Sequence, residues 1–135
     1  MLCNVLLMGK ASGFEELEAW KSAREFRKKI SAAAKKFPPH ERNKLTDQIT
    51  RSSRSVSANI SEGYGRYHFK ENAHHCRIAR GSLTETLDHL IVALDEGYID
   101  EVQMNDFRKD FERCLKLING YLNYLKNGPA SMKDN

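Results

Sequence analysis

Apolar residues recur every three or four positions along most of the chain, which is the spacing of one face of an α-helix. The pattern predicts helices over residues 13–37, 40–62, 68–96 and 100–126, within one bundle domain at 12–127. The predicted turns are short, so consecutive helices must lie side by side and run in opposite directions. The sequence therefore predicts an all-α fold, an antiparallel up-down-up-down four-helix bundle.

Residues that favour helix ends support these boundaries. Pro38 stops the first helix because the residue before a proline is driven out of the helical region. Gly63 is expected to end the second helix in a left-handed conformation, and the third is expected to end before Gly97. Asp100 and Gln103 have the spacing of a capping box, which predicts the start of the fourth helix.

The third predicted helix carries the longest regular stripe, which keeps a seven-residue rhythm over nearly four heptads. Its members are Phe69, Ala73, Cys76, Arg80, Leu83, Leu87, Leu90 and Leu94. Only Arg80 interrupts the apolar pattern. We expect this stripe to face the core, with Leu87 and Phe111 of the fourth helix at central positions.

The second predicted helix contains five serines at positions where a bundle helix usually carries alanine or leucine. Small side chains let two helices approach closely, and we expect the second and third helices to do so. The predicted small residues are Ser52, Ser53, Ser57, Ala58, Gly81 and Ser82. Close approach leaves polar groups to satisfy, and the candidates for a hydrogen-bonded contact are Asn59, Glu62, Ser82 and Glu85. Exposure to solvent is the alternative for this set.

The two ends of the chain and the cysteines indicate the expected cellular location. Residues 1–11 are interpreted as an N-terminal extension, and 128–135 as a polar tail. The apolar run near the start is too short for a membrane span and lacks the features of a signal peptide. Three widely spaced cysteines indicate neither a disulfide framework nor a zinc site. We therefore expect a cytoplasmic protein with reduced thiols and no membrane association.

Catalytic and metal chemistry find little support in the sequence. Glu71 and His74 match one Glu-x-x-His motif, but a di-iron bundle needs a second copy on another helix. A four-helix ribonuclease with a conserved Arg-x4–6-His signature is also disfavoured, because no arginine here has that spacing to a histidine. The helical serines lack a nucleophile elbow. We expect no cofactor, no metal and no enzymatic activity, with a cryptic nuclease or metalloprotein as the weakest alternative.

Charge is distributed unevenly along the chain. Residues 11–37 carry seven Lys/Arg against four Asp/Glu, whereas residues 81–107 carry none against seven. Such an electrically polarised molecule attracts polyanions on one side. The candidate nucleic-acid-binding residues are Arg51, Arg54, Arg66, Lys70, Arg77 and Arg80. An ordinary solvated face is the competing interpretation of these cations.

Two segments carry a specific resemblance. LTDQITRSSRSVSANISEGYGR (residues 45–66) and IARGSLTETLDHLIVALDEGYI (78–99) closely resemble the four helix bundle protein family, also called the 23S rRNA intervening-sequence protein family. The likeness runs from about residue 14 to 125. The matching motif positions are Gln48, Arg51, Asn59, Ile60, Glu62, Gly63, Ala79, Gly81, Ser82 and Glu85. Serines at 52 and 53 depart from the family's usual small apolar residues.

The resemblance implies a bacterial protein related to those encoded inside ribosomal RNA genes and to the accessory protein of diversity-generating retroelements. The latter is a basic pentameric ring that binds nucleic acid and a reverse transcriptase. We therefore expect a non-catalytic homo-oligomer, by resemblance a pentamer, that binds RNA or DNA and has a reverse transcriptase as a candidate partner. A protein-binding scaffold without nucleic-acid binding is the alternative.

Overall fold

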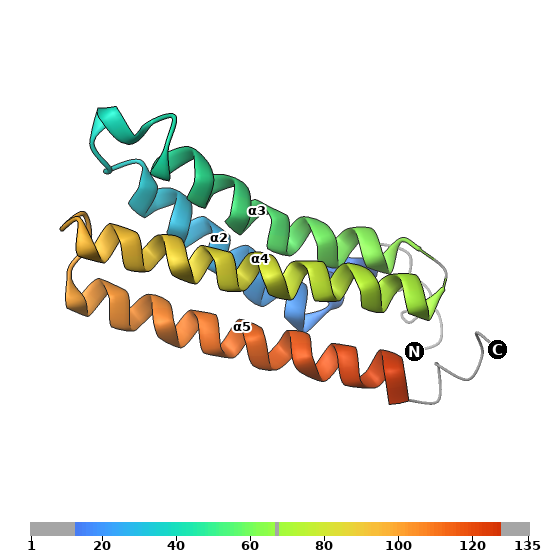
Figure 1. Cartoon of the computed structure of the whole chain (residues 1–135). Helices are drawn as coiled ribbons and strands as arrows, with labels where there is room; N and C mark the ends of the chain where they lie inside the picture. Colours follow the sequence, from blue (N-terminus) through green and yellow to red (C-terminus); the bar gives the residue numbers. More distant parts are fainter. Residues whose placement is uncertain (1–12, 67, 128–135) are drawn as a thin grey trace.

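The computed structural model of the chain is a bundle of four long helices (Figure 1). It describes residues 13–66 and 68–127. The long helices are α2 (Glu18–Ala34), α3 (Leu45–Tyr64), α4 (Phe69–Asp95) and α5 (Glu101–Asn127). Two short 3-10 helices, η1 (Gly13–Glu16) and η2 (Pro39–Glu41), precede α2 and α3. The predicted extension at 1–11 and tail at 128–135 lie outside the described residues.

Consecutive helices run in alternate directions along the bundle (Figure 1). Two hydrogen bonds show this for α3 and α4, because Ser52 pairs with Thr86 and Ser55 pairs with Ser82, each at 2.8 Å. Helix α2 packs against α3 and α5, and α4 packs against the same two helices. The groove between α2 and α3 therefore lies on the opposite side of the bundle from the groove between α4 and α5.

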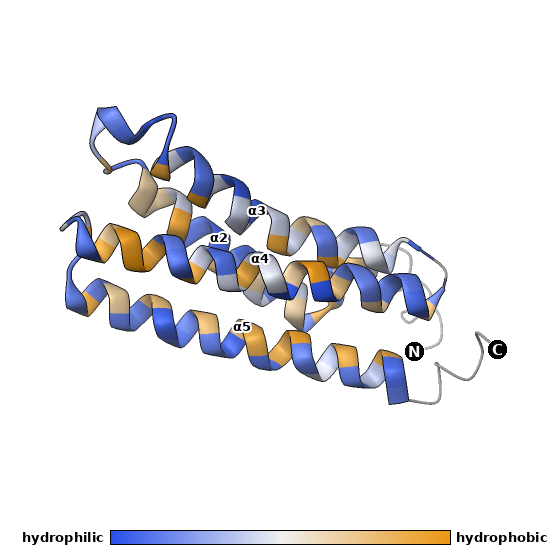
Figure 2. Cartoon of the chain, in the orientation of Figure 1, coloured by the Kyte–Doolittle hydropathy of each residue, from blue (hydrophilic) through white to orange (hydrophobic). Residues whose placement is uncertain are grey.

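One apolar core runs the length of the bundle, and Figure 2 shows apolar stripes on each helix between polar surfaces. All four helices contribute large side chains that are less than 2 % exposed. They include Phe26, Ile30, Ile49, Ile60, Leu83, Leu90, Met104 and Ile118. Burial of a side chain of this size contributes about 1.5–3 kcal/mol, so the core supplies most of the driving force for the fold.

The buried face of α4 is rotated from the predicted stripe. Thr86, Ala79 and Ala93 are fully buried, whereas Leu87 and Leu94 are only partly buried and pack at the edge of the core. The prediction chose the larger apolar residue of each neighbouring pair. Small residues are buried instead because α3 lies close to this face, and a close helix pair has room only for small side chains.

Gly63 lies where α3 and α4 approach closely. It lies inside α3 rather than at a left-handed cap, so its predicted role was wrong. A Cβ atom at this position would lie 2.8 Å from Asn72 Oδ1 and 2.9 Å from the Cβ atom of His75. Both distances are shorter than van der Waals contact, so the absence of a side chain lets the two helices pack.

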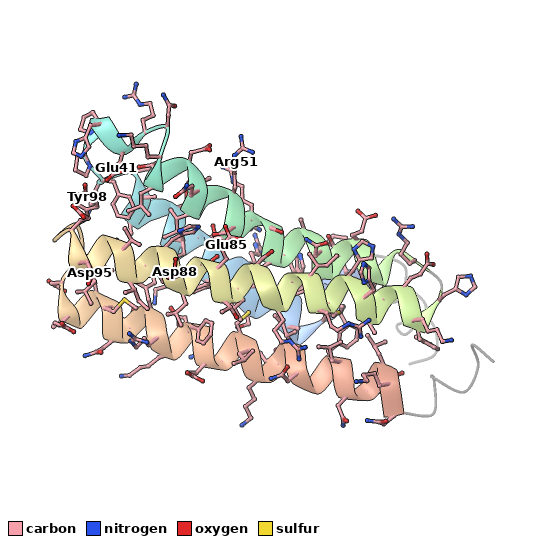
Figure 3. The ribbon with its side chains drawn as sticks, in the orientation of Figure 1. Glu41, Arg51, Glu85, Asp88, Asp95 and Tyr98 are labelled. Carbon is pink, nitrogen blue, oxygen red and sulfur yellow. The ribbon has the colours of Figure 1, made fainter. Side chains whose placement is uncertain are left out.

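Helix α3 begins at Leu45, five residues after the predicted start at His40. The chain first forms η2 and a turn, and Lys44 has a non-helical backbone with φ −125° and ψ −108°. Glu41 then caps α3, because its Oε1 atom accepts a hydrogen bond of 3.2 Å from the backbone N–H of Leu45. Its Oε2 atom accepts a second, of 2.7 Å, from the hydroxyl of Tyr98. Figure 3 shows this pair at one end of the bundle, where it ties two loops together.

The first predicted helix is also divided. It begins as η1, and Leu17 has an extended backbone (φ −72°, ψ 126°) that separates η1 from α2. Helix α2 ends at Ala34, three residues before the predicted end, and Phe37 turns back to pack 5.5 Å from the ring of Tyr98. The apolar pattern predicted one continuous helix, but the extended backbone of Leu17 breaks it.

The connection between α4 and α5 agrees with the sequence prediction. Gly97 adopts the left-handed conformation with φ +80°, and the Tyr98 N–H donates to the Ala93 carbonyl at 2.8 Å. These features form a Schellman motif. At the start of α5, the Asp100 side chain accepts from the Gln103 N–H, and the Gln103 side chain accepts from the Asp100 N–H. The predicted capping box is thus confirmed.

Candidate nucleic-acid interface

The six cations predicted to bind nucleic acid do not share one face. Arg51 and Arg54 lie on α3, Arg66 lies just after it, and the other three lie on α4. Arg54 borders the groove between α2 and α3, whereas Arg77 and Arg80 border the groove between α4 and α5. These two grooves are on opposite sides of the bundle, so one duplex or strand segment cannot contact both directly on a single copy. Lys70, the remaining predicted cation, is exposed in the first turn of α4.

Two of the six cations are partly neutralised by neighbouring carboxylates. Arg51 points away from the bundle (Figure 3) and its Nε atom lies 3.0 Å from an oxygen of Asp47. Arg66 lies 3.0 Å from Glu62 and 3.7 Å from Glu71. Exposed pairs of this kind are weak, but they reduce the local positive potential that a phosphate would experience. These arginines are therefore weaker phosphate ligands than the sequence pattern indicates.

A basic hollow of about 280 Å³ lies between α2 and α3. We call it the α2–α3 hollow; its lining residues are Arg27, Lys28, Ser31, Ala32, Lys35 and Arg54. Four of the six are cations and none is a carboxylate. Arg27 is held in place by a 3.1 Å hydrogen bond from its Nε atom to Ser57 Oγ, which leaves the rest of its guanidinium for other acceptors. Concentrated positive charge with hydrogen-bond donors suits phosphate oxygens.

The cations that α2 brings to this hollow were not among the predicted site residues. The sequence signal was present, because residues 11–37 have an excess of Lys/Arg. However, α2 also carries Lys29, which points elsewhere and bridges to Asp106 and Asp110 of α5. Hydrogen bonds to these two carboxylates raise the pKa of Lys29. Sequence position alone does not separate a cation in an ion-pair network from one that faces a groove.

The two helix pairs differ in net charge. Residues 18–64, which span α2 and α3, carry eleven Lys/Arg against five Asp/Glu. Residues 69–127, which span α4 and α5, carry eight against ten. Glu85, Asp88 and Asp95 follow one another along α4 (Figure 3). The bundle is therefore polarised, with the α2–α3 side positive relative to the α4–α5 side.

A second hollow, of about 200 Å³, lies between α4 and the second half of α5. We call it the α4–α5 hollow; its lining residues are Arg77, Arg80, Asn119, Leu122, Asn123, Lys126 and Asn127. Arg80 donates to Asn119 Oδ1 at 2.9 Å. Although the α4–α5 side is acidic as a whole, this lining contains three cations and no carboxylate.

Residues with reactive side chains are buried or separate from both hollows. Burial raises the pKa of the Cys76 and Cys114 thiols to about 11, so neither is a thiolate at neutral pH. His74 and His75 lie beside each other on α4. Within the described residues, no three His, Cys, Asp or Glu side chains are grouped to hold a metal ion. The expectation of no catalysis stays a prediction.

Comparisons with known proteins address the fold and the family. A family model described as 23S rRNA-intervening sequence protein matches residues 15–120. The chain belongs to this family. A crystal structure from Bacteroides thetaiotaomicron, described as a protein with unknown function from the S23 ribosomal protein family, is similar with a TM-score of 0.72. It is 23% identical, and the match covers 78% of this chain and 95% of that one, so it supports the fold alone. No curated protein sequence gives a significant match.

In this member of the 23S rRNA-intervening sequence protein family, three of the matching motif residues, Asn59, Gly63 and Ser82, lie at the contact between α3 and α4. Asn59 donates to the Ser55 carbonyl and hydroxyl at 2.9 and 3.0 Å, and its Oδ1 atom lies 3.2 Å from His75 Nδ1. Ser55 in turn pairs with Ser82. Two of the four predicted polar residues, Asn59 and Ser82, are thus brought to this contact.

The other two predicted polar residues lie outside this contact. Glu62 is exposed and pairs with Arg66, and Glu85 is exposed and lies 3.1 Å from His89. Long carboxylate side chains on this part of the helices reach solvent, while the hydroxyls of serine and threonine fit the narrow space between the backbones. Thr86 was not predicted to join the polar contact, because a single threonine among leucines does not indicate a hydrogen-bonded position between helices. The motif residues Asn59, Gly63 and Ser82 therefore serve helix packing, whereas Glu62 and Glu85 do not.

No helix in the described part of the chain has the length and apolar character needed to cross a membrane.

Proposed function

We propose that this protein is a non-catalytic, oligomeric module that binds nucleic acid without sequence specificity through its α2–α3 side. The observation that carries the proposal is the α2–α3 hollow, which is lined by four cations and no carboxylate; one of the four, Lys28, lies 3.7 Å from Glu25 outside the lining. The family is described by a ribosomal RNA element, which agrees with a nucleic-acid partner. RNA and DNA share the phosphate chemistry that this surface suits.

The helices of the bundle hold the backbone of the α2–α3 side in place. Arg27, Lys28 and Arg54 lie on two long helices packed by the core, and Lys35 directly follows α2, so the backbone positions of the four cations are fixed before phosphates bind. Arg27, Ser31 and Lys35 are spaced four residues apart, which places donors on one face of the last turns of α2 and at its C-cap. A stripe of this kind tracks a phosphate backbone and does not read base edges. We therefore expect binding that depends on salt and tolerates sequence.

Self-association is part of the proposal. Tyr124 is 50 % exposed and Ile78 is 40 % exposed, although both are large and apolar. An apolar groove of about 410 Å³ between α2 and α5 is lined by Leu17, Ala19, Leu117, Gly120 and Tyr121, with two charged neighbours. A second copy would cover such surface. A ring built in this way repeats the basic side of each copy. Light scattering that gives a monomer mass at micromolar concentration would contradict it.

A paired set of variants tests the binding surface. Lys35→Ala/Arg54→Ala removes two cations from the α2–α3 hollow, and Arg108→Ala/Lys109→Ala removes two exposed cations from α5. Both double variants change the net charge by the same amount, so non-specific attraction falls equally. We expect the first pair to weaken binding of a labelled single-stranded RNA at least tenfold more than the second. Fluorescence anisotropy at low salt measures the difference, and circular dichroism and light scattering check the fold and the assembly.

Two outcomes would overturn the proposal. Equal loss in both double variants would mean that the α2–α3 hollow is not the binding surface. The absence of binding by the parent protein at low salt, for RNA and DNA alike, would favour a protein-binding scaffold. A reverse transcriptase as the partner of such a scaffold would be tested by co-purification of the two proteins.

A further inference from the structure

The α4–α5 hollow is lined almost entirely by hydrogen-bond donors. Arg77, Arg80 and Lys126 are cations that only donate. Asn119, Asn123 and Asn127 each carry a carbonyl oxygen, and those of Asn119 and Asn123 already accept a hydrogen bond each. Asn119 Oδ1 accepts from Arg80 at 2.9 Å, and Asn123 Oδ1 accepts from Asn127 at 2.8 Å. The three cations and the amide nitrogens of Asn119 and Asn123 make donors more numerous than acceptors here, so the hollow suits a ligand with several acceptor atoms.

The size and charge of the hollow define the ligand further. Its volume of about 200 Å³ is below the range of roughly 300–1,000 Å³ that is usual for sites that enclose whole drug-sized molecules. A compact group with several acceptor oxygens fits better. Three cations with no lining carboxylate favour a group with two negative charges over one with a single charge. A terminal phosphate has close to two charges at neutral pH, whereas an internal phosphodiester has one.

We propose that the α4–α5 hollow binds a terminal phosphate group, and that its source is the end of a nucleic-acid strand. The source rests on the function proposed above, but the phosphate chemistry rests only on the lining of the hollow. Because this hollow lies opposite the α2–α3 hollow, one copy does not present both to the same phosphates. In an assembly, the α2–α3 hollow of one copy contacts the backbone while the α4–α5 hollow of another holds the strand end.

The test compares one oligoribonucleotide with a 5′-phosphate, a 3′-phosphate or hydroxyls at both ends. We expect one of the phosphorylated forms to bind about tenfold more tightly than the hydroxyl form, which is the scale of a charge-assisted hydrogen bond. Inorganic phosphate at millimolar concentration should remove the preference, because it occupies the same hollow. Equal affinity for all three oligonucleotides would overturn the proposed strand-end source.

A matched pair of variants assigns the preference to the hollow. Asn123→Asp changes a donor into a carboxylate inside the hollow and keeps the shape of the side chain. Asn105→Asp makes the same change at an exposed position of the same helix. We expect Asn123→Asp to abolish the preference for the phosphorylated strand and Asn105→Asp to keep it. A preference that survives in Asn123→Asp, with the fold intact by circular dichroism, would place the phosphate elsewhere.

The outcome also separates this inference from the proposed function. If all oligonucleotides bind in a salt-dependent way without regard to their ends, the proposed function stands and the strand-end site does not. If no oligonucleotide binds but calorimetry detects inorganic phosphate in the parent and not in Asn123→Asp, the phosphate site stands and the proposed function fails. If calorimetry and anisotropy both show no effect of Asn123→Asp, the site is refuted.

Discussion

Replacing Gly63 with alanine tests how closely α3 and α4 pack. In a helix interior, alanine is favoured over glycine by about 1 kcal/mol. Helix propensity alone would therefore raise the free energy of unfolding of Gly63→Ala by up to this amount. However, the new Cβ atom would lie 2.8 Å from Asn72 Oδ1, 2.9 Å from His75 Cβ and 3.0 Å from the Asn72 carbonyl oxygen. The last two atoms belong to the backbone of α4 or adjoin it, so relief requires movement of the helix. Overpacking of this kind costs about 1–3 kcal/mol.

Gly81 provides the matched control. It is an exposed glycine of α4, and a Cβ atom there would meet nothing within 4 Å. Gly81→Ala should therefore raise the free energy of unfolding by about 0.5–1 kcal/mol. Gly63 lies in the last turn of α3 and Gly81 in the middle of α4, so the gain in helix propensity at Gly63 is at most that at Gly81, and a difference larger than about 1 kcal/mol reports the steric cost. We expect Gly63→Ala to be less stable than Gly81→Ala by about 1–3 kcal/mol.

Urea unfolding followed by circular dichroism measures this difference, at one fixed protein concentration because self-association shifts apparent stability. In a thermal scan, 1 kcal/mol corresponds to roughly 4 °C for a domain of this size. A Gly63→Ala protein that is as stable as Gly81→Ala would refute the close contact between α3 and α4.

Three further predictions concern buried or paired groups. Thr86→Val removes the buried hydroxyl that pairs with Ser52 and should lower the free energy of unfolding by about 1 kcal/mol, while Thr84→Val at an exposed position should change it little. The hydrogen bond from Tyr98 lowers the pKa of Glu41 from its ordinary value of 4.5, so the stability lost in Tyr98→Phe should be largest at pH 7 and should diminish as the pH falls below 4.5 and through the lowered pKa of Glu41. A loss of stability that is the same at acidic and neutral pH would contradict this coupling. Burial raises the pKa of Cys76 to about 11, so in the folded protein this thiol should react with an aromatic disulfide at pH 8 far more slowly than in urea, and rapid labelling of its peptide would contradict the buried position.

Local signals predicted much of the fold. The capping box at Asp100 and the glycine at position 97 act through the nearest few residues, so their effects are visible in the sequence. The start of α3 was missed because it depends on Glu41, whose side chain reaches forward to cap Leu45 and is itself held by a distant tyrosine. Long-range contacts of this kind leave no periodic pattern.

The register of α4 shows a second limit. Leu87 is more apolar than Thr86, so hydropathy favoured the leucine as the buried residue. Thr86 is fully buried because its hydroxyl pairs with Ser52 and also donates to the Ser82 carbonyl, which satisfies it inside a narrow contact. Only the distance between two helices decides which residue of the pair fits.

The candidate site was predicted least completely. Arg54, Arg77 and Arg80 do line basic hollows, but the sequence placed them with Arg66 on one continuous surface. The order of the helices around the bundle separates them, and it also brings Arg27 and Lys35 of α2 beside Arg54. The pairing of Arg66 with Glu62 follows the i,i+4 rule and was readable from the sequence.

The most direct test of nucleic-acid binding is the salt dependence of affinity for unrelated single-stranded RNA sequences of equal length. Each phosphate neutralised by a cation releases counterions, so the logarithm of the affinity should fall with the logarithm of salt by about 0.7 per contact. The α2–α3 hollow of one copy has four lining cations. The account therefore predicts that log affinity falls with log salt with a slope of about −2 to −3 for every sequence, and with a steeper slope if copies assemble. A slope near zero, or affinities that depend on sequence but not on salt, would contradict the account.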